Sequence, residues 1–125
     1  MSTPWDAFYV VTGYRAGTVK FGITGGDGRA RLDAHRKDGY PVCRLLMTGM
    51  PAGMAEDMER ALLRALKYIE TEPVQGREYF PGECLDMILM LSEHFPAYWL
   101  AGHRGTYAAI RFGTGDTAGF LARCG

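Results

Sequence analysis

The stretch that decides the fold is Val19-Lys20-Phe21-Gly22-Ile23-Thr24, and Arg31-Leu32-Asp33-Ala34-His35 follows it. The first segment is rich in β-branched and aromatic residues and ends at a glycine-rich loop, which is typical of a strand. The second segment predicts a helix in which Arg31 and His35 lie on one face, because they are four residues apart. Arginine binds phosphate through a forked, permanently charged group, and histidine can transfer a proton near neutral pH. The two segments together indicate chemistry on a phosphodiester.

Length and composition predict a single folded domain. The chain has 125 residues, of which 47% are hydrophobic and 22% are charged, and this balance is typical of a globular protein. No apolar run approaches the roughly 20 residues that a membrane-spanning helix needs, and the first residues lack the pattern of a secretion signal. The three cysteines are an odd number at wide spacing, so they predict packing residues in a reducing compartment. We therefore expect a cytoplasmic protein without a membrane partner.

The charge pattern permits a nucleic-acid partner without demanding one. The chain carries 14 basic and 14 acidic residues. Residues 1–50 hold seven basic and four acidic groups, a net charge of +3, whereas residues 51–125 hold seven and ten, a net charge of −3. A basic half can approach a polyanion and an acidic half can hold a cation. Ordinary scatter of surface charge explains the same counts equally well, and a tight, sequence-independent nucleic-acid binder is usually more basic.

The predicted elements describe an α/β (α+β) domain with a small three-stranded, mainly antiparallel sheet flanked by helices. Strands are expected over 7–12, 18–24 and 42–48. Helices are expected from the glycine-rich loop to about 38, from 51 or 52 to about 70, and from about 81 to 95. Beyond residue 95 the pattern weakens, and 106–112 fits either a strand or a loop. We therefore expect a domain over 1–95 and a C-terminal extension of unknown role over 96–125.

Two further residues are suited to phosphodiester chemistry. Tyr9 lies in the middle of the first strand, where a tyrosine is either a core residue with a bound hydroxyl or a group that relays a proton. Glu59 lies at the edge of the apolar stripe of the second helix, where a partly desolvated carboxylate can hold a divalent cation. The alternative for Glu59 is an exposed residue paired with a neighbouring basic side chain. For Arg31 and His35 the alternative is a solvated helix face.

These segments together resemble the GIY-YIG nuclease superfamily, especially its small bacterial and phage branch. The matching segments follow one another in order: Phe8-Tyr9-Val10, Lys20-Phe21-Gly22, the Arg-Leu-x-x-His helix, a later helix with a glutamate, and Gly76-Arg77-Glu78-Tyr79-Phe80. The resemblance covers about residues 7–91. Each motif consists of a few common residues, and the specificity lies in their order and spacing.

The resemblance implies a bacterial or phage-encoded, metal-dependent endonuclease that hydrolyses phosphodiester bonds, with DNA as the expected nucleic-acid substrate. Arg31 matches the catalytic arginine, and His35 matches the histidine one turn later. Glu59 matches the glutamate that binds Mg²⁺ or Mn²⁺, and Tyr9 would act as the base or as a proton relay. The resemblance further implies that three residues contact the substrate: Lys20, Gly22 and Arg29.

One position departs from the family pattern, because Lys20 stands where the second motif has a tyrosine. Lysine can bind a phosphate, but it is a poor base unless its pKa is lowered. This departure favours an alternative function, a catalytically silent module of the same fold that binds nucleic acid or a nucleotide-like ligand. The complete set of four catalytic matches favours the enzyme, because a pure binder has no need of a carboxylate near phosphate. The oligomeric state, monomer or homodimer, stays open.

Overall fold

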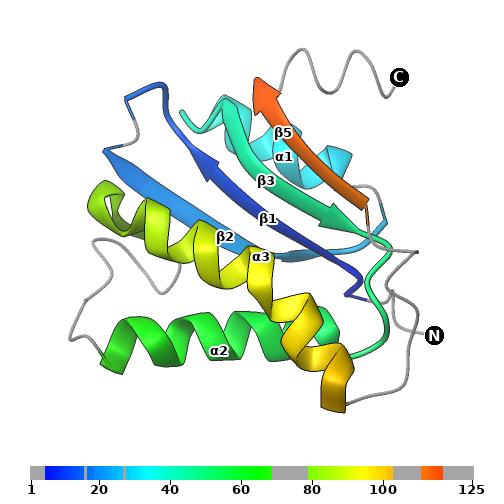
Figure 1. Ribbon diagram of the computed structural model, residues 1–125. Coiled ribbons are helices and arrows are strands. Elements are labelled where there is room, and N and C mark those ends of the chain that lie inside the picture. Colours follow the sequence, from blue (N-terminus) through cyan, green and yellow to red (C-terminus); the bar gives the residue numbers. More distant parts are fainter. Residues whose placement is uncertain (1–4, 16, 27, 69–78, 103–110, 117–125) are drawn as a thin grey trace.

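The structure, a computed structural model, describes residues 5–15, 17–26, 28–68, 79–102 and 111–116, and at 79, 100–102 and 111–116 it describes the backbone alone. At the centre of this part of the chain is a five-stranded sheet in the order β4-β2-β1-β3-β5 (Figure 1). Its strands are β1 (Ala7–Thr12), β2 (Thr18–Thr24), β3 (Val42–Thr48), β4 (Tyr79–Pro81) and β5 (Arg111–Asp116). Each strand runs antiparallel to its neighbours.

The α+β class expected from the sequence is confirmed, whereas the expected number of strands is wrong. The three predicted strands are present as β1, β2 and β3 with the predicted bounds. The sheet has five strands because β4 pairs with the start of β2 and β5 pairs with β3. With only three residues, β4 is too short for the period of two that marks a strand in a sequence.

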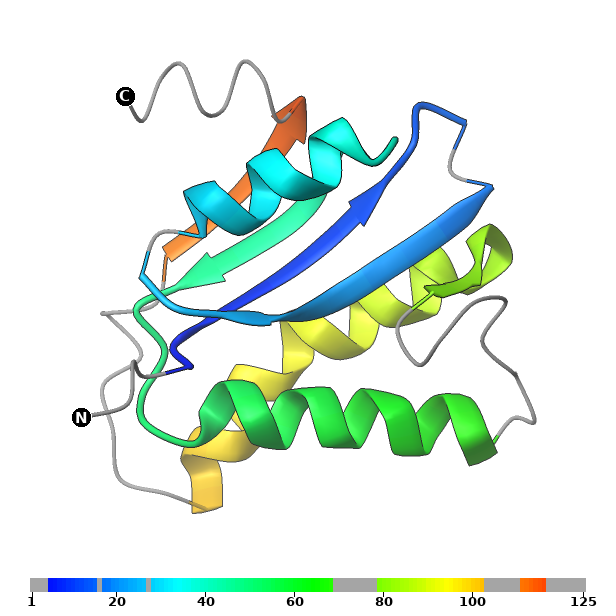
Figure 2. The same ribbon diagram turned by 180° about the vertical axis from the view of Figure 1, so that it is seen from behind.

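Helices cover both faces of the sheet (Figures 1 and 2). Helix α1 (Arg29–Lys37) covers one face, and α2 (Met54–Tyr68) and α3 (Leu85–Gly102), with the short η1 (Gly82–Cys84) before it, cover the other. All six residues of β1 are buried, because alternate side chains enter two different cores. The smaller core, under α1, consists of Tyr9, Val11, Leu32, Cys43 and Leu46. The larger core, on the opposite face, includes Phe8, Val10, Phe21, Met58, Leu62 and Ile88.

Helix α3 continues beyond the expected domain boundary at residue 95. It contains Pro96 and ends at Gly102, although an internal proline removes one backbone hydrogen bond. Trp99, which is 7% exposed, packs in the larger core and donates a hydrogen bond of 2.9 Å from Nε1 to Oδ2 of Asp57 on α2. The segments 96–102 and 111–116, expected to lie in an extension, therefore belong to the packed domain. None of the described helices is long and apolar enough to cross a membrane.

The strand directions bring two helix starts to one end of the sheet. Because β2 and β3 both run antiparallel to β1, they finish at the same end, which we call the Thr24 end. Helix α1 begins shortly after β2 and α2 shortly after β3. Both helices therefore begin at the Thr24 end, on opposite faces of the sheet (Figure 2). At the other end, the Thr12 end, lie the β1–β2 turn and the turn that joins α1 to β3.

Candidate functional site

A hydrogen bond joins β1 to α1 at the centre of the smaller core. The Oη atom of Tyr9 and the Nε2 atom of His35 are 2.9 Å apart. Tyr9 is 2% exposed and His35 is 6% exposed, and their ring centroids are 5.0 Å apart with the planes tilted by 41°. Tyr9 is a core residue with a bound hydroxyl, and His35 does not lie on a solvated face.

Gly22 makes room for the tyrosine ring. It is the partner of Tyr9 across the β1–β2 pair, and a Cβ atom at this position would lie 2.7 Å from Oη and 3.0 Å from Cζ of Tyr9. A glycine inside a strand often marks such a close approach. The sequence analysis assigned Gly22 to substrate contact and missed this packing role, although the glycine in mid-strand was the available signal.

The first turn of α1 presents two arginines at the Thr24 end. Gly28 begins the helix in a left-handed conformation, φ 73°, and its carbonyl accepts a hydrogen bond of 2.9 Å from the Leu32 amide. Arg29 is half-buried, whereas Arg31 is exposed and lies one turn before His35. Among the described residues Arg31 takes part in no ion pair. Its guanidinium is therefore available to an anion from solvent.

The positive charge of the last turn of α1 is partly neutralised by Asp33, which lies on the same helix. Asp33 pairs with Arg36 at 2.8 Å and with Lys37 at 3.1 Å. Hydrogen bonds from these two side chains hold the pKa of Asp33 below its ordinary value. The basic residues at the C-terminal end of the helix are thus engaged within it, unlike Arg31 at its start.

Lys20 is buried on the same face of the sheet as Tyr9. It is 5% exposed and lies opposite Val11 in the β1–β2 pair. Because side chains alternate along a strand, those of Lys20 and Thr18 point to the face of β2 on which Gly22 receives Tyr9. The residue that departs from the family pattern is thus a buried lysine next to the Tyr9–Gly22 contact.

Glu59 lies at the Thr24 end but in the other helix layer. It is half-buried on α2, and Leu63, one turn later on the same side, packs against the larger core. Ile23 of β2 packs against that core as well. In the described part of the chain β4 pairs only with residues 18–20 of β2, so the outer edge of 21–24 lies between α1 and α2. The structure brings Tyr9, Gly22 and His35 together, places the exposed Arg31 one turn before His35 on α1, and keeps Glu59 on the other face of the sheet.

Two carboxylates of α2, Glu59 and Glu56, could supply ligands to a divalent cation whose remaining ligands would be water and substrate phosphate. In the described part of the chain no group of three or more His, Cys, Asp or Glu side chains could hold a metal ion. Mg²⁺ does not require such a group, since it commonly binds one or two carboxylates together with water and substrate phosphate. Glu56 lies one turn before Glu59, and its Oε1 atom is buried without a hydrogen-bond partner among the described residues. The sequence pattern places Glu56 toward solvent, whereas in the structure it is half-buried and its Oε1 atom is covered.

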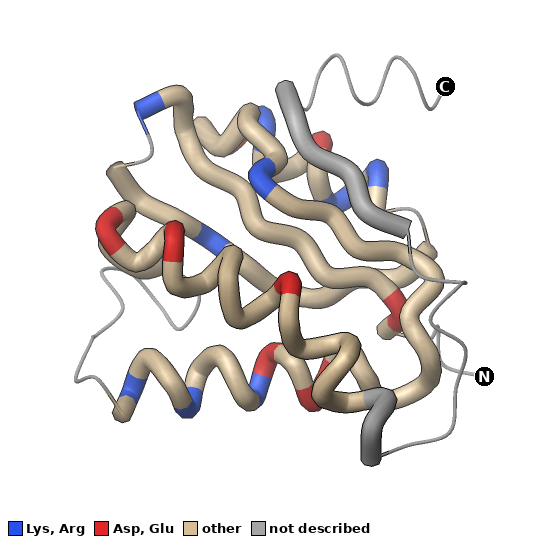
Figure 3. Tube along the Cα trace, viewed as in Figure 1, with Lys and Arg blue, Asp and Glu red and all other residues tan. Residues whose placement is uncertain are grey.

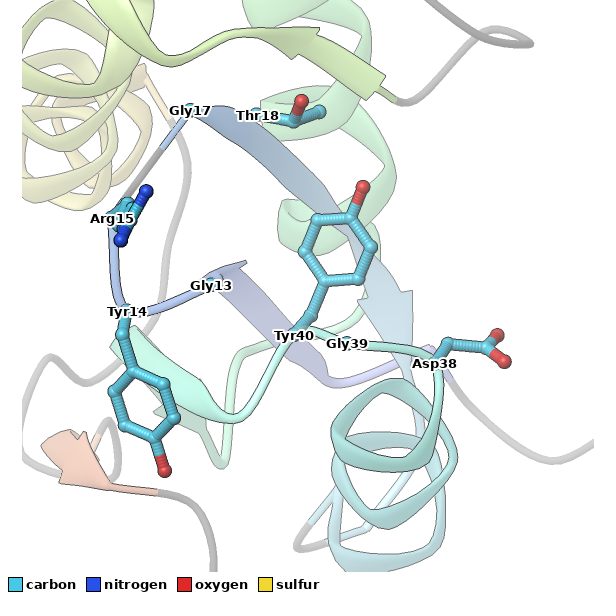
Figure 4. Close-up of a pocket in the computed structure, with 8 residues that line it drawn as sticks. All are labelled: Gly13, Tyr14, Arg15, Gly17, Thr18, Asp38, Gly39 and Tyr40. Carbon is cyan, nitrogen blue, oxygen red and sulfur yellow. The ribbon is translucent and has the colours of Figure 1, made fainter.

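A cavity of about 450 Å³ lies at the Thr12 end of the sheet, away from the helix starts (Figure 4). Its walls come from the β1–β2 turn and from the turn after α1: Gly13, Tyr14, Arg15, Gly17, Thr18, Asp38, Gly39 and Tyr40. None of the residues expected at the active site lines it. The sequence analysis named no function for any of its walls, because two turns far apart in the chain build it.

Compared with protein-family models, with curated proteins and with solved structures, the chain has no match. Function is therefore inferred from the residues and from their geometry.

Proposed function

We propose that the protein is a metal-dependent endonuclease that hydrolyses phosphodiester bonds in DNA. The observation that carries the proposal is the buried hydrogen bond of 2.9 Å between Tyr9 and His35, with the exposed Arg31 one turn earlier on the same helix. A proton-transfer pair beside a phosphate-binding cation is what in-line displacement at a phosphodiester needs from a protein. The same residues were expected in these roles from the sequence.

In this proposal the proton moves along the Tyr9–His35 hydrogen bond. Nε2 of His35, in its unprotonated form, accepts the proton of the Tyr9 hydroxyl, and the tyrosine oxygen accepts a proton from the attacking water. Arg31 neutralises the charge that develops on the phosphate in the transition state. Mg²⁺ or Mn²⁺, held by Glu59 with Glu56 as a second carboxylate, would act as a Lewis acid toward the phosphate.

The distribution of charge supports a polyanionic substrate on the α1 face. Helix α1 contains four basic residues and one acidic residue, a net charge of +3. On the opposite face, residues 82–102 contain three acidic residues and neither lysine nor arginine. Basic positions accordingly lie along α1 and acidic positions along η1 and α3, whereas α2 carries three basic and three acidic residues (Figure 3). This asymmetry across the sheet would direct a nucleic acid toward Arg29 and Arg31.

The proposal is tested by cleavage of supercoiled and linear DNA with Mg²⁺ or Mn²⁺. We expect Glu59→Gln and Arg31→Gln to lower the cleavage rate by about 100-fold or more, because removal of one group that stabilises transition-state charge commonly costs this much. Glu83→Gln and Arg64→Gln change the same residue types at exposed positions and should cleave like the wild type. The nuclease proposal fails if no metal supports cleavage, or if the site variants and the controls behave alike. An RNA substrate of the same sequence in a parallel reaction measures the preference for DNA.

The second candidate function is the catalytically silent module that binds nucleic acid or a nucleotide-like ligand. The buried Lys20 in the second motif favours it, because a cation can hold a phosphate there without supplying a base. This candidate predicts binding of DNA in EDTA by the wild type and no cleavage with any added metal. Cleavage that depends on Glu59 would exclude it.

A further inference from the structure

Backbone hydrogen bonds fix the two turns that form the cavity at the Thr12 end, one of them to η1 and the other within the turn after α1. The Gly17 carbonyl accepts a hydrogen bond of 3.0 Å from the Gly82 amide, and the His35 carbonyl accepts one of 2.8 Å from the Tyr40 amide. A Cβ atom at Gly13 would lie 3.3 Å from the carbonyl oxygen of Gly39, so the two turns approach each other closely. Gly39 itself has a φ of +97°, which favours glycine. A volume of about 450 Å³ is in the range of small-ligand sites.

The side chains of the cavity supply an aromatic ring and a cation. Tyr40 is half-buried, packs against the smaller core, and extends its ring between the two turns toward Thr18 (Figure 4). A ring fixed in this way can serve as a stacking platform for a base. Arg15 lies on the other turn, is exposed, and makes no ion pair among the described residues. The ring of Tyr14 and the carboxylate of Asp38 point away from the space between the turns (Figure 4).

We infer that this cavity binds one nucleotide unit, with its base stacked on Tyr40 and its phosphate held by Arg15. A planar guanidinium binds phosphate through paired hydrogen bonds, and the glycines of both turns let the ligand approach the backbone. The inference rests on the proposed function insofar as it makes the nucleotide part of a nucleic-acid strand. Thr18 lines the cavity and lies four residues before Gly22 on β2. This spacing corresponds to roughly 13 Å, so the unit would flank the scissile phosphate.

The test is binding without cleavage, in EDTA. The probe is a fluorescein-labelled single-stranded DNA 12-mer, and its anisotropy is measured with the full chain and with variants. We expect Tyr40→Ala to weaken binding by about 5- to 100-fold, the usual range for loss of one stacked base, and Tyr40→Trp to bind like the wild type. Arg15→Gln should weaken binding and lower the slope of log K against log salt by about 0.7. Tyr98→Ala and Arg64→Gln, at exposed positions on other helices, are the matched controls and should bind like the wild type.

Three outcomes would overturn the inference. These are wild-type binding by Arg15→Gln, equal binding by Tyr40→Trp and Tyr40→Ala, or equal losses in the controls. Arg15 is exposed, so its variant remains informative if Tyr40→Ala unfolds on heating at a lower temperature.

Competition by deoxyadenosine monophosphate, compared with an unlabelled strand, separates a site for free nucleotides from a site for a strand. If binding depends on Tyr40 and Arg15 while no metal supports cleavage, the nuclease proposal fails and the nucleotide site stands. If cleavage depends on Glu59 but the affinity for the strand is unchanged in the Tyr40 and Arg15 variants, the nucleotide-site inference fails and the nuclease proposal stands.

Discussion

The Tyr9 side chain contacts two neighbours that limit what can replace it. Its hydroxyl is 2.9 Å from Nε2 of His35, and its ring lies where a Cβ atom at position 22 would be. Tyr9→Phe removes the hydroxyl and leaves the buried imidazole without that partner, which costs about 1–3 kcal/mol of stability. Gly22→Ala brings a methyl group against the ring, and overpacking of this kind costs about 1–3 kcal/mol.

The two substitutions should not be additive. In the double variant the contact at 2.7 Å disappears with the hydroxyl, and only the approach to Cζ at 3.0 Å remains. We therefore expect the loss in free energy of unfolding to be smaller than the sum of the single losses, as measured by urea denaturation in a double-mutant cycle. Gly17→Ala is the control, because a Cβ atom there meets nothing within 4 Å. Strict additivity would show that Gly22 is not retained for the Tyr9 ring.

Cys43 gives the smaller core a dependence on alkaline pH. Burial raises the pKa of its thiol to about 11, and a backbone hydrogen bond at Leu45 opposes this in part. Because the folded pKa lies above the unfolded one, this stabilising contribution is complete below about pH 9 and is lost as the pH rises toward 11. The loss amounts to about 2–3 kcal/mol. Urea denaturation between pH 8 and 11 should show a steeper decline for the wild type than for Cys43→Ala, and parallel declines would contradict this assignment.

Among the helices and strands, the sequence predicted those whose own residues carry a clear hydrophobic pattern, and it missed those that depend on contacts distant in the chain. The strand β1 was predicted because it is a short run of β-branched and aromatic residues, and the helix α2 because its apolar residues recur at the helical period. The sequence of β5, Arg-Phe-Gly-Thr-Gly-Asp, lacks such alternation, and its pairing with β3 comes from contacts distant in the chain. Pro96 is a signal for a helix end, yet α3 continues past it because its later turns are anchored on α2. The Tyr9–His35 bond likewise depends on how α1 lies on β1, which no local pattern encodes.

The anchor between α3 and α2 is Trp99. Its ring is 7% exposed, and Nε1 donates a hydrogen bond of 2.9 Å to Oδ2 of Asp57. We expect Trp99→Phe to lower the free energy of unfolding by about 1–3 kcal/mol, because it removes ring volume and leaves Asp57 without this donor. Trp5→Phe alters a tryptophan that is 47% exposed and should have little effect. Equal urea midpoints for both variants would show that the link does not stabilise the helix pair.

In the described part of the molecule the two faces of the sheet differ in net charge, although α2 itself is balanced, with three acidic and three basic residues. Helix α1 carries the basic residues, and residues 82–102 carry acidic ones only. Glu59, which the resemblance implies as the metal ligand, lies with Glu56 on α2, whereas Arg31, the proposed phosphate contact, lies on α1 on the opposite face of the sheet. A nuclease on this frame would hold its substrate at the Thr24 end, around the edge of β2 that no described strand covers. The affinity of a nucleic-acid strand for the α1 face should therefore fall as the salt concentration rises.

The described structure packs against its core two segments that the sequence analysis assigned to an extension, the end of α3 and β5. A chain ending at residue 95 loses the last turns of α3, with Trp99, and loses β5, whose pairing satisfies one edge of β3. We expect this fragment to lose about 3–5 kcal/mol from the missing tryptophan alone, and more from the unpaired strand edge. Urea denaturation followed by circular dichroism should show a lower midpoint and a broader transition than in the full chain. Trp99→Ala in the full chain measures how much of the lost free energy of unfolding comes from the Trp99 side chain. A fragment that unfolds with the midpoint and steepness of the full chain would establish residues 1–95 as a domain in their own right.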